Sequence, residues 1–401
     1  MTDLRSDVLI VGGGPAGSAC AWKLRRAGLD VLVVDGAPFP RDKVCAGWIT
    51  PQVVEGLALD LEAYAQGRTL QPITGFRAGV IGSDVDVVIG YDRPVSYGIR
   101  RCEFDHYLLQ RSQARLELGA PIQSLERQDG LWIATPRGPT ARPSKARFTA
   151  PMLVGAGGHW CPVACLLNPH PRKPGKGLRR EDENPEESAP IVVAQEAEFP
   201  ISGPGAGGFA TAPDTPELYF SPDLTGYGWC FRKQRYLNVG FGSLDVRTCQ
   251  KATDRFSAYL KARQTIPAVA SWRWRGHAYL VSTPRRRRVS GDGVLLIGDA
   301  AGLAYPQSGE GIRPAIESGL LAATTVIDAG GSYTRDRLKG YERALLARLH
   351  AESDDPSRSR RIVPGSLAEK LATLALRVPW FVRHVVLDRW FLRAAESALS
   401  A

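Results

Sequence analysis

The chain has 401 residues, of which 44% are apolar and 23% are charged, a composition typical of a globular protein long enough for two domains. No stretch approaches the roughly 20 consecutive apolar residues of a membrane-spanning helix, and Met1–Asp7 is too short and too polar for a signal peptide. We therefore expect a soluble, cytoplasmic protein.

The formal net charge is +10, and arginine-rich runs at Arg285–Arg288 and Arg358–Arg361 carry much of it. A solvated surface is the interpretation we favour for these runs. An acidic lipid surface or an anionic cofactor is the alternative. Nucleic acid is not indicated, because no basic motif interleaved with aromatic residues accompanies the charge.

The seven cysteines are scattered and odd in number, which suits free thiols in a reducing compartment rather than a disulfide framework. Cys161 and Cys165 are close in sequence, but no second Cys/His pair at ligand spacing accompanies them. We therefore expect no metal site.

Residues 6–36 are predicted to form a strand, a helix and a second strand. Asp7–Val11 is a short apolar run that ends at glycine. Pro15 suits the first turn of a helix, and Gly28 suits the left-handed residue that follows one. The stretch is a βαβ unit.

Three glycines occupy the turn of this unit at the spacing G-x-G-x-x-G: Gly12, Gly14 and Gly17. They allow a tight turn, the approach of a pyrophosphate to the backbone and close packing of helix on strand. Asp35 ends the second strand, where a carboxylate can accept hydrogen bonds from ribose hydroxyls. This unit predicts a dinucleotide site but does not separate FAD from NAD.

Further along the chain, residues 51–98 and 186–284 contain strand-like stretches. Examples are VDVVIGYD, IVVAQEAEF and YGWCFRK. A mainly antiparallel sheet that covers the cofactor is the expected arrangement. Between them, residues 170–188 have almost no apolar side chains, so 171–185 is predicted to be a flexible surface loop.

Tyr227, Trp229 and Phe231 alternate along one predicted strand, so their side chains share a face. They can line an apolar pocket, which we favour, or form the ordinary buried face of a sheet. YLNVGFG is predicted to pair with this strand across a turn at Lys233–Arg235.

A second glycine-rich turn follows the apolar run GVLLI, in GDAAGLAYPQSGEGI. Asp299 ends that strand, where its carboxylate can accept hydrogen bonds from a polyol chain. Gly311 and Ile312 open another helix, whose N-terminus would place its positive dipole near an electron-rich ring. Because NAD has no ribityl chain, this turn favours FAD.

The tail from residue 364 is predicted to be helical and broken near Pro379. It interleaves apolar side chains with arginine. Docking on the core is the interpretation we favour. Contact with a membrane surface through Trp380, Trp390 and Arg393 is the alternative.

From about residue 6 to 345 the chain resembles the geranylgeranyl reductase family of FAD-dependent oxidoreductases, in the larger group that contains p-hydroxybenzoate hydroxylase and the flavin-dependent halogenases. The stretches that carry the resemblance are DVLIVGGGPAGSACAWKLRRAG, DKVCAGWITP, GIRRCEFDHYLL, GYGWCFRKQRYLNVGFG and GVLLIGDAAGLAYPQSGEGIRPAIESG. The chain departs from the pattern at Arg232, where the reductases usually have proline, and at Gly155–Gly158, where GADG is usual. The Trp-x-Trp-x-Ile-Pro motif of halogenases is absent, which disfavours halogenation.

The resemblance implies roles for individual residues. Arg101, rather than its neighbour Arg100, would lie beside the FAD pyrophosphate. Cys45 would lie over the flavin face, where its thiol could donate a proton or tune access, or simply pack. The residues expected to bind the cofactor are Gly12, Gly14, Pro15, Ala16, Gly17, Asp35, Cys45, Ala46, Arg101, Gly298, Asp299, Gly311 and Ile312. Those expected in the substrate pocket are Tyr227, Trp229, Phe231 and Tyr305.

The expected fold is therefore α/β, with a Rossmann-like FAD-binding domain, an interleaved and mainly antiparallel substrate domain, and a helical C-terminal region. The FAD-binding domain would comprise residues 1–50, 99–170 and 285–345. The substrate domain would comprise 51–98 and 186–284, and the C-terminal region 346–401.

The resemblance implies an enzyme that reduces carbon–carbon double bonds of an isoprenoid or other apolar substrate, with hydride from flavin N5. An FAD-dependent aromatic monooxygenase and a non-catalytic prenyl-binding escort are the alternatives. No second G-x-G-x-x-G offers a nicotinamide domain, so the electrons would come from transiently bound NAD(P)H or from a reduced carrier protein.

Overall fold

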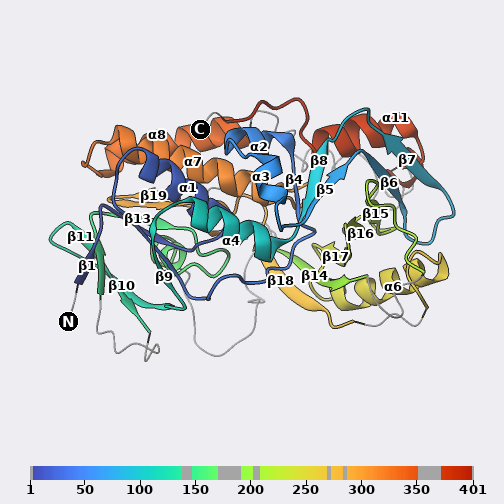
Figure 1. The fold of residues 1–401 in the computed structure, drawn as a ribbon, viewed down its shortest axis with the longest axis horizontal. Coiled ribbons are helices and arrows are strands. Elements are labelled where there is room, and N and C mark those ends of the chain that lie inside the picture. Colours follow the sequence, from blue (N-terminus) through green and yellow to red (C-terminus); the bar gives the residue numbers. More distant parts are fainter. Residues whose placement is uncertain are drawn as a thin grey trace.

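The computed structural model describes residues 3–137, 147–169, 191–201, 208–268, 272–282, 287–350 and 372–399. The loop predicted at 171–185, the run Arg358–Arg361, and Arg285 and Arg286 of the other basic run lie outside the described residues. Figure 1 shows helices α1, α7 and α8 in one part of the molecule, and the largest sheet with α6 and α11 in the other.

A six-stranded sheet forms the centre of the first part, in the order β19-β20-β13-β2-β3-β9. All neighbouring strands are parallel except β19 and β20. Its strands are β2 (Val8–Val11), β3 (Val31–Asp35), β9 (Arg115–Leu118), β13 (Met152–Gly155), β19 (Ser290–Gly291) and β20 (Val294–Leu296). Strands buried on both faces have continuous apolar sequences, as VLIV and MLVG do here.

Helices α1 (Pro15–Arg26), α7 (Ile312–Asp328) and α8 (Arg335–His350) pack together beside this sheet. A four-stranded sheet, in the order β1-β12-β11-β10, packs against the strands of the central one. Its strands are β1 (Asp3–Arg5), β10 (Ile122–Gln128), β11 (Leu131–Pro136) and β12 (Arg147–Ala150). The Rossmann-like α/β fold expected from the sequence is confirmed.

A seven-stranded sheet forms the second part, in the order β18-β14-β17-β16-β15-β6-β7. Only β15 and β6 run parallel. Its strands are β6 (Gly75–Val80), β7 (Asp86–Gly90), β14 (Ile191–Pro200), β15 (Glu217–Phe220), β16 (Gly226–Lys233), β17 (Tyr236–Ser243) and β18 (Arg275–Leu280). β16 and β17 form the predicted hairpin, because Lys233 pairs with Tyr236.

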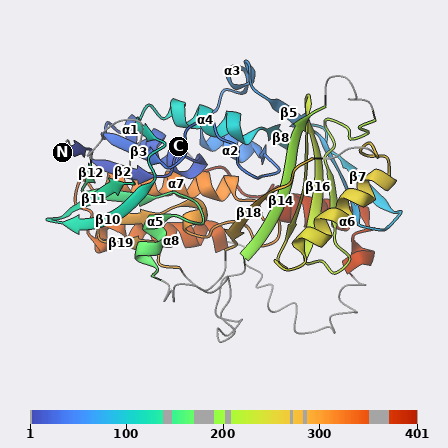
Figure 2. The same ribbon diagram turned by 90° about the horizontal axis from the view of Figure 1, so that it is seen from below.

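Each face of the seven-stranded sheet is covered by helix. Helix α6 (Cys249–Ala262) packs on one face through Phe256 and Leu260, against β17 and β14, and Figure 2 shows it lying along this sheet. The other face packs against the C-terminal segment α11 (Pro379–Phe381) and the π-helix η2 (Val382–Phe391). Side chains that alternate along β16 therefore enter two different cores.

The remaining elements connect these parts. A three-stranded sheet has the order β4-β8-β5. Its strands and the other helices are β4 (Trp48–Ile49), β5 (Leu70–Ile73), β8 (Ser96–Ile99), α2 (Pro51–Gly56), α3 (Leu61–Ala65), α4 (Arg101–Arg111), α5 (Pro162–Leu167) and the 3₁₀ helix η1 (Gly298–Ala300).

The C-terminal segment docks on the protein core. Val382, Val386, Leu387 and Phe391 are fully or almost fully buried against the seven-stranded sheet. Of the side chains weighed for membrane contact, Trp380 is exposed, whereas Trp390 packs on Phe381 and the Arg393 guanidinium stacks on Tyr305. Within the described residues, every helix is too short or too polar to cross a bilayer.

Candidate functional site

A continuous cavity of about 610 Å³ lies where the two parts of the molecule meet. The carboxyl ends of β2 and β3 and the start of α1 form one end of it. The start of α7, the loop from Arg41 to Trp48, and strands β15, β16 and β18 form much of the rest. Ligands of open parallel sheets bind beyond the carboxyl ends of the strands, which is the position of this cavity.

The turn between β2 and α1 has no room for side chains at two of its glycines. Gly12 has a φ of +120°, and a Cβ there would lie 2.3 Å from the carbonyl oxygen of Ala156. A Cβ on Gly17 would lie 1.9 Å from the carbonyl oxygen of Gly12. The residues of this turn that line the cavity are Gly12, Gly14, Pro15 and Ala16. Gly17 does not line it and instead packs against Gly12 and Ile10.

Asp35 lines the same end of the cavity, at the last position of β3. One carboxylate oxygen accepts the Gly13 N–H at 2.7 Å, and the other accepts the Ala37 N–H at 2.9 Å. These bonds orient the carboxylate beside the glycine turn. Because each carboxylate oxygen has two acceptor sites, both oxygens can still accept a ribose hydroxyl.

Arg101, at the start of α4, lines the cavity and is 6% exposed. Its guanidinium makes two 2.7 Å bonds to the buried Asp105. Arg100 does not line the cavity and instead binds Glu198 and Glu103. Burial lowers the pKa of Arg101, but Asp105 and Cys45 outweigh it and hold that pKa above its usual value.

Arg41 is a second cation at this end that sequence reasoning missed. Its guanidinium lies 4.7 Å from the centre of the Phe39 ring and 3.6 Å from an Asp105 oxygen, and it lines the cavity. The pair Arg41 and Arg101 gives this end the positive charge that a pyrophosphate requires.

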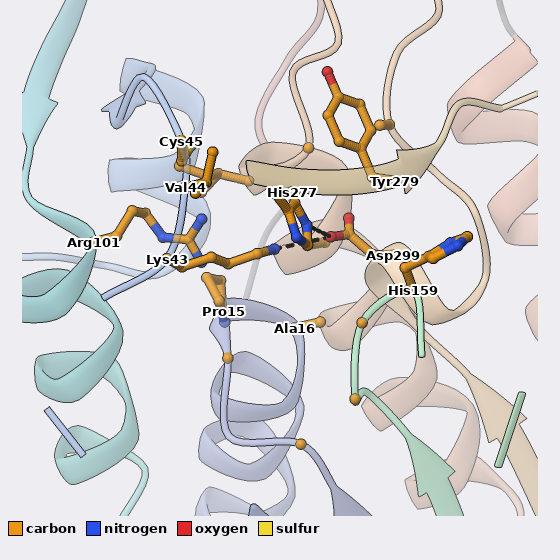
Figure 3. Close-up of a pocket in the computed structure, with 18 of the residues that line it drawn as sticks. Pro15, Ala16, Lys43, Val44, Cys45, Arg101, His159, His277, Tyr279 and Asp299 are labelled. Carbon is orange, nitrogen blue, oxygen red and sulfur yellow. Dashed lines mark hydrogen bonds and ion pairs between the residues drawn. The ribbon is translucent and has the colours of Figure 1, made fainter. Parts of the chain in front are cut away.

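Asp299 is the centre of a second group of charged side chains in the cavity, apart from Arg41 and Arg101. Its carboxylate lies 2.9 Å from the Lys43 ammonium and 3.9 Å from His277 Nε2, as Figure 3 shows. Burial would raise the pKa of Asp299, but Lys43 and His277 hold it well below its usual value. Gly311 and Ile312 line the cavity nearby, whereas Gly298 does not and donates its N–H to the Ser318 hydroxyl.

Cys45 lies on the same loop as Arg41 and Lys43, and Ala46 follows it in the cavity wall. The Cys45 N–H donates to Glu196 at 2.6 Å, and the Gly47 N–H lies 3.4 Å from the Cys45 sulfur. Burial raises the pKa of Glu196 to about 7. The loop is therefore anchored on β14 by a buried carboxyl group.

Asn238 joins this loop to the strand of alternating aromatics. Its amide oxygen accepts the Trp229 indole N–H at 2.7 Å, and its amide nitrogen donates to the Cys45 carbonyl at 3.3 Å. The same nitrogen lies 3.3 Å from Glu196 and 3.2 Å from Glu198. Asn238 is 1% exposed, so the network is shielded from solvent.

An apolar wall completes the far side of the cavity. Tyr227, Trp229 and Phe231 all line it, with Leu218 from β15 and Trp48 from β4. The Trp48 and Phe231 rings stack with centres 5.1 Å apart. Tyr305 does not line the cavity, because its ring is buried under the Arg393 guanidinium.

Sequence reasoning also missed Lys43, His277, Tyr279 and Glu310, which all line the cavity. Lys43 and His277 converge on Asp299 from a loop and from β18, so no sequence spacing relates them. Glu310 stands between two glycines at the start of α7, and that context was the available signal.

The cavity fits FAD. It is continuous from Asp35 and the glycine turn, past Arg101 and Lys43, to Asp299 and the start of α7. A cofactor with a pyrophosphate between a ribose and a ribityl chain matches this order of groups. A Cβ on Gly14 would meet only the tip of Arg41, at 3.3 Å, so the backbone is open to a ligand there.

Comparisons with known proteins identify relatives of the chain. The profile of the FAD binding domain family matches residues 5–351. Menaquinone reductase of Mycobacterium tuberculosis is 30% identical over 348 residues, covering 80% of this chain and 76% of that protein. Geranylgeranyl diphosphate reductase of Rhodobacter capsulatus is 28% identical over 341 residues, covering 80% and 74%.

A solved structure supports the fold. The geranylgeranyl bacteriochlorophyll reductase-like protein of Thermoplasma acidophilum superposes with a TM-score of 0.72 at 20% identity. The match covers 100% of this chain and 94% of that protein.

Proposed function

This chain belongs to the FAD binding domain family and is an FAD-dependent oxidoreductase, and we propose that it reduces carbon–carbon double bonds of an isoprenoid or similarly apolar substrate. The observation that carries the proposal is the continuity of the cavity. The charged end that suits FAD opens directly onto the wall of Trp48, Leu218, Trp229 and Phe231. An apolar chain can therefore lie against the wall while one of its double bonds faces the cofactor.

The names of the relatives support the same substrate class. Proteins named menaquinone reductase and geranylgeranyl diphosphate reductase both match most of the chain. Menaquinone carries a prenyl chain, and geranylgeranyl diphosphate is a prenyl chain that bears a diphosphate group. Both named substrates therefore contain an isoprenoid chain.

In this proposal each group of residues binds a different part of FAD. Gly12, Gly14 and Arg101 hold the pyrophosphate, Asp35 holds the adenosine ribose, and Asp299 holds the ribityl chain. Pro15, Ala16, Ala46, Gly311 and Ile312 line the remaining length of the cofactor, with Gly17 and Gly298 supporting the turns from behind. Reduced FAD supplies hydride when it is bound. The apolar wall orients the substrate and excludes water.

Cys45 belongs to the reacting part of the site in this proposal. It lines the same cavity as Arg101 and the apolar wall, and its loop is held by Glu196 and Asn238. Cys45→Ser should bind FAD normally and turn over more slowly, because the serine keeps the backbone contacts but changes the group at the cofactor face. Unchanged turnover would remove Cys45 from the mechanism.

The electron donor is proposed to be NAD(P)H that binds transiently or a reduced carrier protein. Stopped-flow reduction of the bound flavin by NADH, NADPH or reduced ferredoxin separates these donors.

The test of the proposed function is anaerobic. The flavin of the purified holoenzyme is photoreduced and mixed with a menaquinone or with geranylgeranyl diphosphate. We expect reoxidation of the flavin and a product two hydrogens heavier by mass spectrometry. For menaquinone the product is first reoxidised in air to the quinone form, so that a remaining gain of two hydrogens is assigned to the prenyl chain and not to the quinone ring. Failure of every isoprenoid, together with oxygen-dependent hydroxylation of an aromatic compound, would favour the monooxygenase alternative.

A further inference from the structure

Glu310 is an acidic side chain on the wall of the cavity that the proposed function has not yet used. It stands between Gly309 and Gly311 on the segment that joins η1 to α7. Gly309 has a φ of +67°, and a Cβ there would lie 2.3 Å from the hydroxyl oxygen of Tyr279. The segment therefore packs directly against Tyr279 of β18, which Figure 3 shows above His277.

Glu310 shares the cavity wall with several aromatic side chains. The Tyr227 hydroxyl donates to the carbonyl of Ser308, two residues before Glu310. Tyr227, Trp229 and Phe231 line the same cavity from β16. A carboxyl group in such a setting resists ionisation, because its charged form loses the solvation it has in water.

Backbone groups at the start of α7 act in the opposite direction. The Arg313 N–H donates to a Glu310 carboxyl oxygen at 2.7 Å. It stabilises the carboxylate form, as does the positive end of the helix dipole. The side chain therefore has an environment that supports both its protonated and its ionised state.

We propose that Glu310 is a catalytic acid of this site, which protonates one carbon of the substrate double bond while hydride is added to the other. The step rests on the proposed function. The O–H bond of the Glu310 carboxyl breaks and a C–H bond forms with the π electrons of the alkene. The reduced cofactor supplies the electron pair of the second C–H bond. Glu310 remains as a carboxylate that water at the cavity mouth reprotonates.

The charges that face Glu310 are consistent with this role. Burial raises its pKa to about 7, with Arg313 opposing the shift and Glu317 adding to it. The other titratable or charged groups around the segment are Asp299 beside Gly311, Tyr227 on β16, Tyr279 on β18, Tyr305 with the Arg393 guanidinium over its ring, and Cys45 on the loop from Arg41 to Trp48. Burial raises the pKa of all three tyrosines above the usual value, which makes them weaker acids than Glu310.

The experiment compares Glu310→Gln with Glu310→Asp, and with Glu55→Gln as a matched control on the exposed face of α2. Each holoenzyme is first checked for FAD content by its absorbance spectrum. Infrared difference spectra then test for a protonated carboxyl at pH 6. We expect the same signal in the wild type and in Glu55→Gln, and a smaller one in Glu310→Gln, where the remaining intensity comes from Glu196, whose pKa burial also raises to about 7.

The second readout is single-turnover oxidation of the photoreduced holoenzyme by geranylgeranyl diphosphate, which has no quinone ring to accept the electrons, followed against pH. The wild-type rate should be high below pH 7 and fall above it, because only the protonated acid can donate. Glu310→Gln should be about 100-fold slower or more, and its rate should no longer change with pH around 7. Glu310→Asp should recover part of the rate.

The outcomes distinguish failure of the proposed function from failure of the proposed role of Glu310. A wild-type protein that reduces no isoprenoid contradicts the proposed function, and the role of Glu310 with it. A wild-type protein that turns over, together with a Glu310→Gln variant of equal rate and pH profile, contradicts the role of Glu310 alone. In that case a pH profile lost in Cys45→Ser would assign the proton to Cys45.

Discussion

Gly17 has less free space around it than any other glycine considered for the site. A Cβ there would lie 1.9 Å from the Gly12 carbonyl oxygen and 3.2 Å from a methyl group of Ile10. The first contact is with backbone, so the turn must move to admit even a methyl group. The glycine is therefore required by packing of α1 on β2, and the pyrophosphate site depends on it indirectly.

Gly17→Ala should weaken FAD binding by about tenfold or more, because displacement of the turn by a few tenths of an ångström disturbs charge-assisted contacts worth 1.5–3 kcal/mol each. Gly340→Ala on α8 is the control, since nothing lies within 4 Å of its added Cβ. It should leave FAD affinity unchanged and stabilise the helix by about 0.5–1 kcal/mol. Fluorescence titration with FAD measures the affinity, and equal affinities in the two variants would refute the packing argument.

The buried carboxyl group of Glu196 should make the free energy of unfolding depend on pH. Burial raises its pKa from 4.5 to about 7, so the folded protein binds this proton more tightly than the unfolded chain does. The resulting stabilisation is complete below about pH 4.5 and is lost as the pH rises through 7. Glu196→Gln should therefore be more stable than the wild type at pH 8, by about 1–3 kcal/mol. Urea unfolding at pH 5 and pH 8 tests this, with the exposed Glu126→Gln as control; a wild-type advantage at pH 8 would contradict it.

At the scale of elements, the sequence predicts those helices, strands and turns that depend on short-range sequence pattern. The strand, turn and helix of residues 6–36, the β16–β17 hairpin and the shared face of Tyr227, Trp229 and Phe231 all follow from short-range periodicity. Lys43 and Arg41 were missed because their partners, Asp299 and Asp105, come from distant segments. Tyr305 was expected in the substrate pocket, but its ring lies against the Arg393 guanidinium instead.

The C-terminal element illustrates the same limit. Its helical character was predictable, but which surface it covers was not, because the contact is made with strands more than 100 residues away. Phe391 meets the rings of Trp48, Phe220 and Tyr227 with centres 5.8, 6.4 and 5.3 Å apart. Two of these rings line the cavity, so η2 supports the proposed substrate wall from behind.

Phe391→Ala should lower the free energy of unfolding by about 3–5 kcal/mol, because it leaves a void in a well-packed aromatic cluster. It should also raise KM for an isoprenoid substrate more than it changes FAD affinity, since the cluster adjoins the apolar end of the cavity. Trp380→Ala is the control, because that side chain is 66% exposed. Thermal unfolding and steady-state kinetics measure the two effects; a Phe391→Ala protein with normal KM would separate η2 from the substrate wall.

At the scale of the whole molecule, the cavity is assembled from segments that span most of the chain. The turn at Gly12, the loop at Cys45, the start of α4, strand β16 and the start of α7 contribute side by side. Two glycine-rich turns, more than 280 residues apart in the sequence, therefore lie at opposite ends of the stretch of the cavity that fits one FAD. Neither turn alone distinguishes FAD from a smaller nucleotide.

The most direct test of this account is a titration of the apoprotein with FAD, FMN and ADP, repeated with Gly17→Ala and Asp299→Ala. One FAD should bind per chain, far more tightly than either FMN or ADP, and each substitution should weaken FAD. ADP binding as tightly as FAD, or an Asp299→Ala variant with undiminished affinity for FAD, would contradict the claim that both turns hold a single flavin nucleotide.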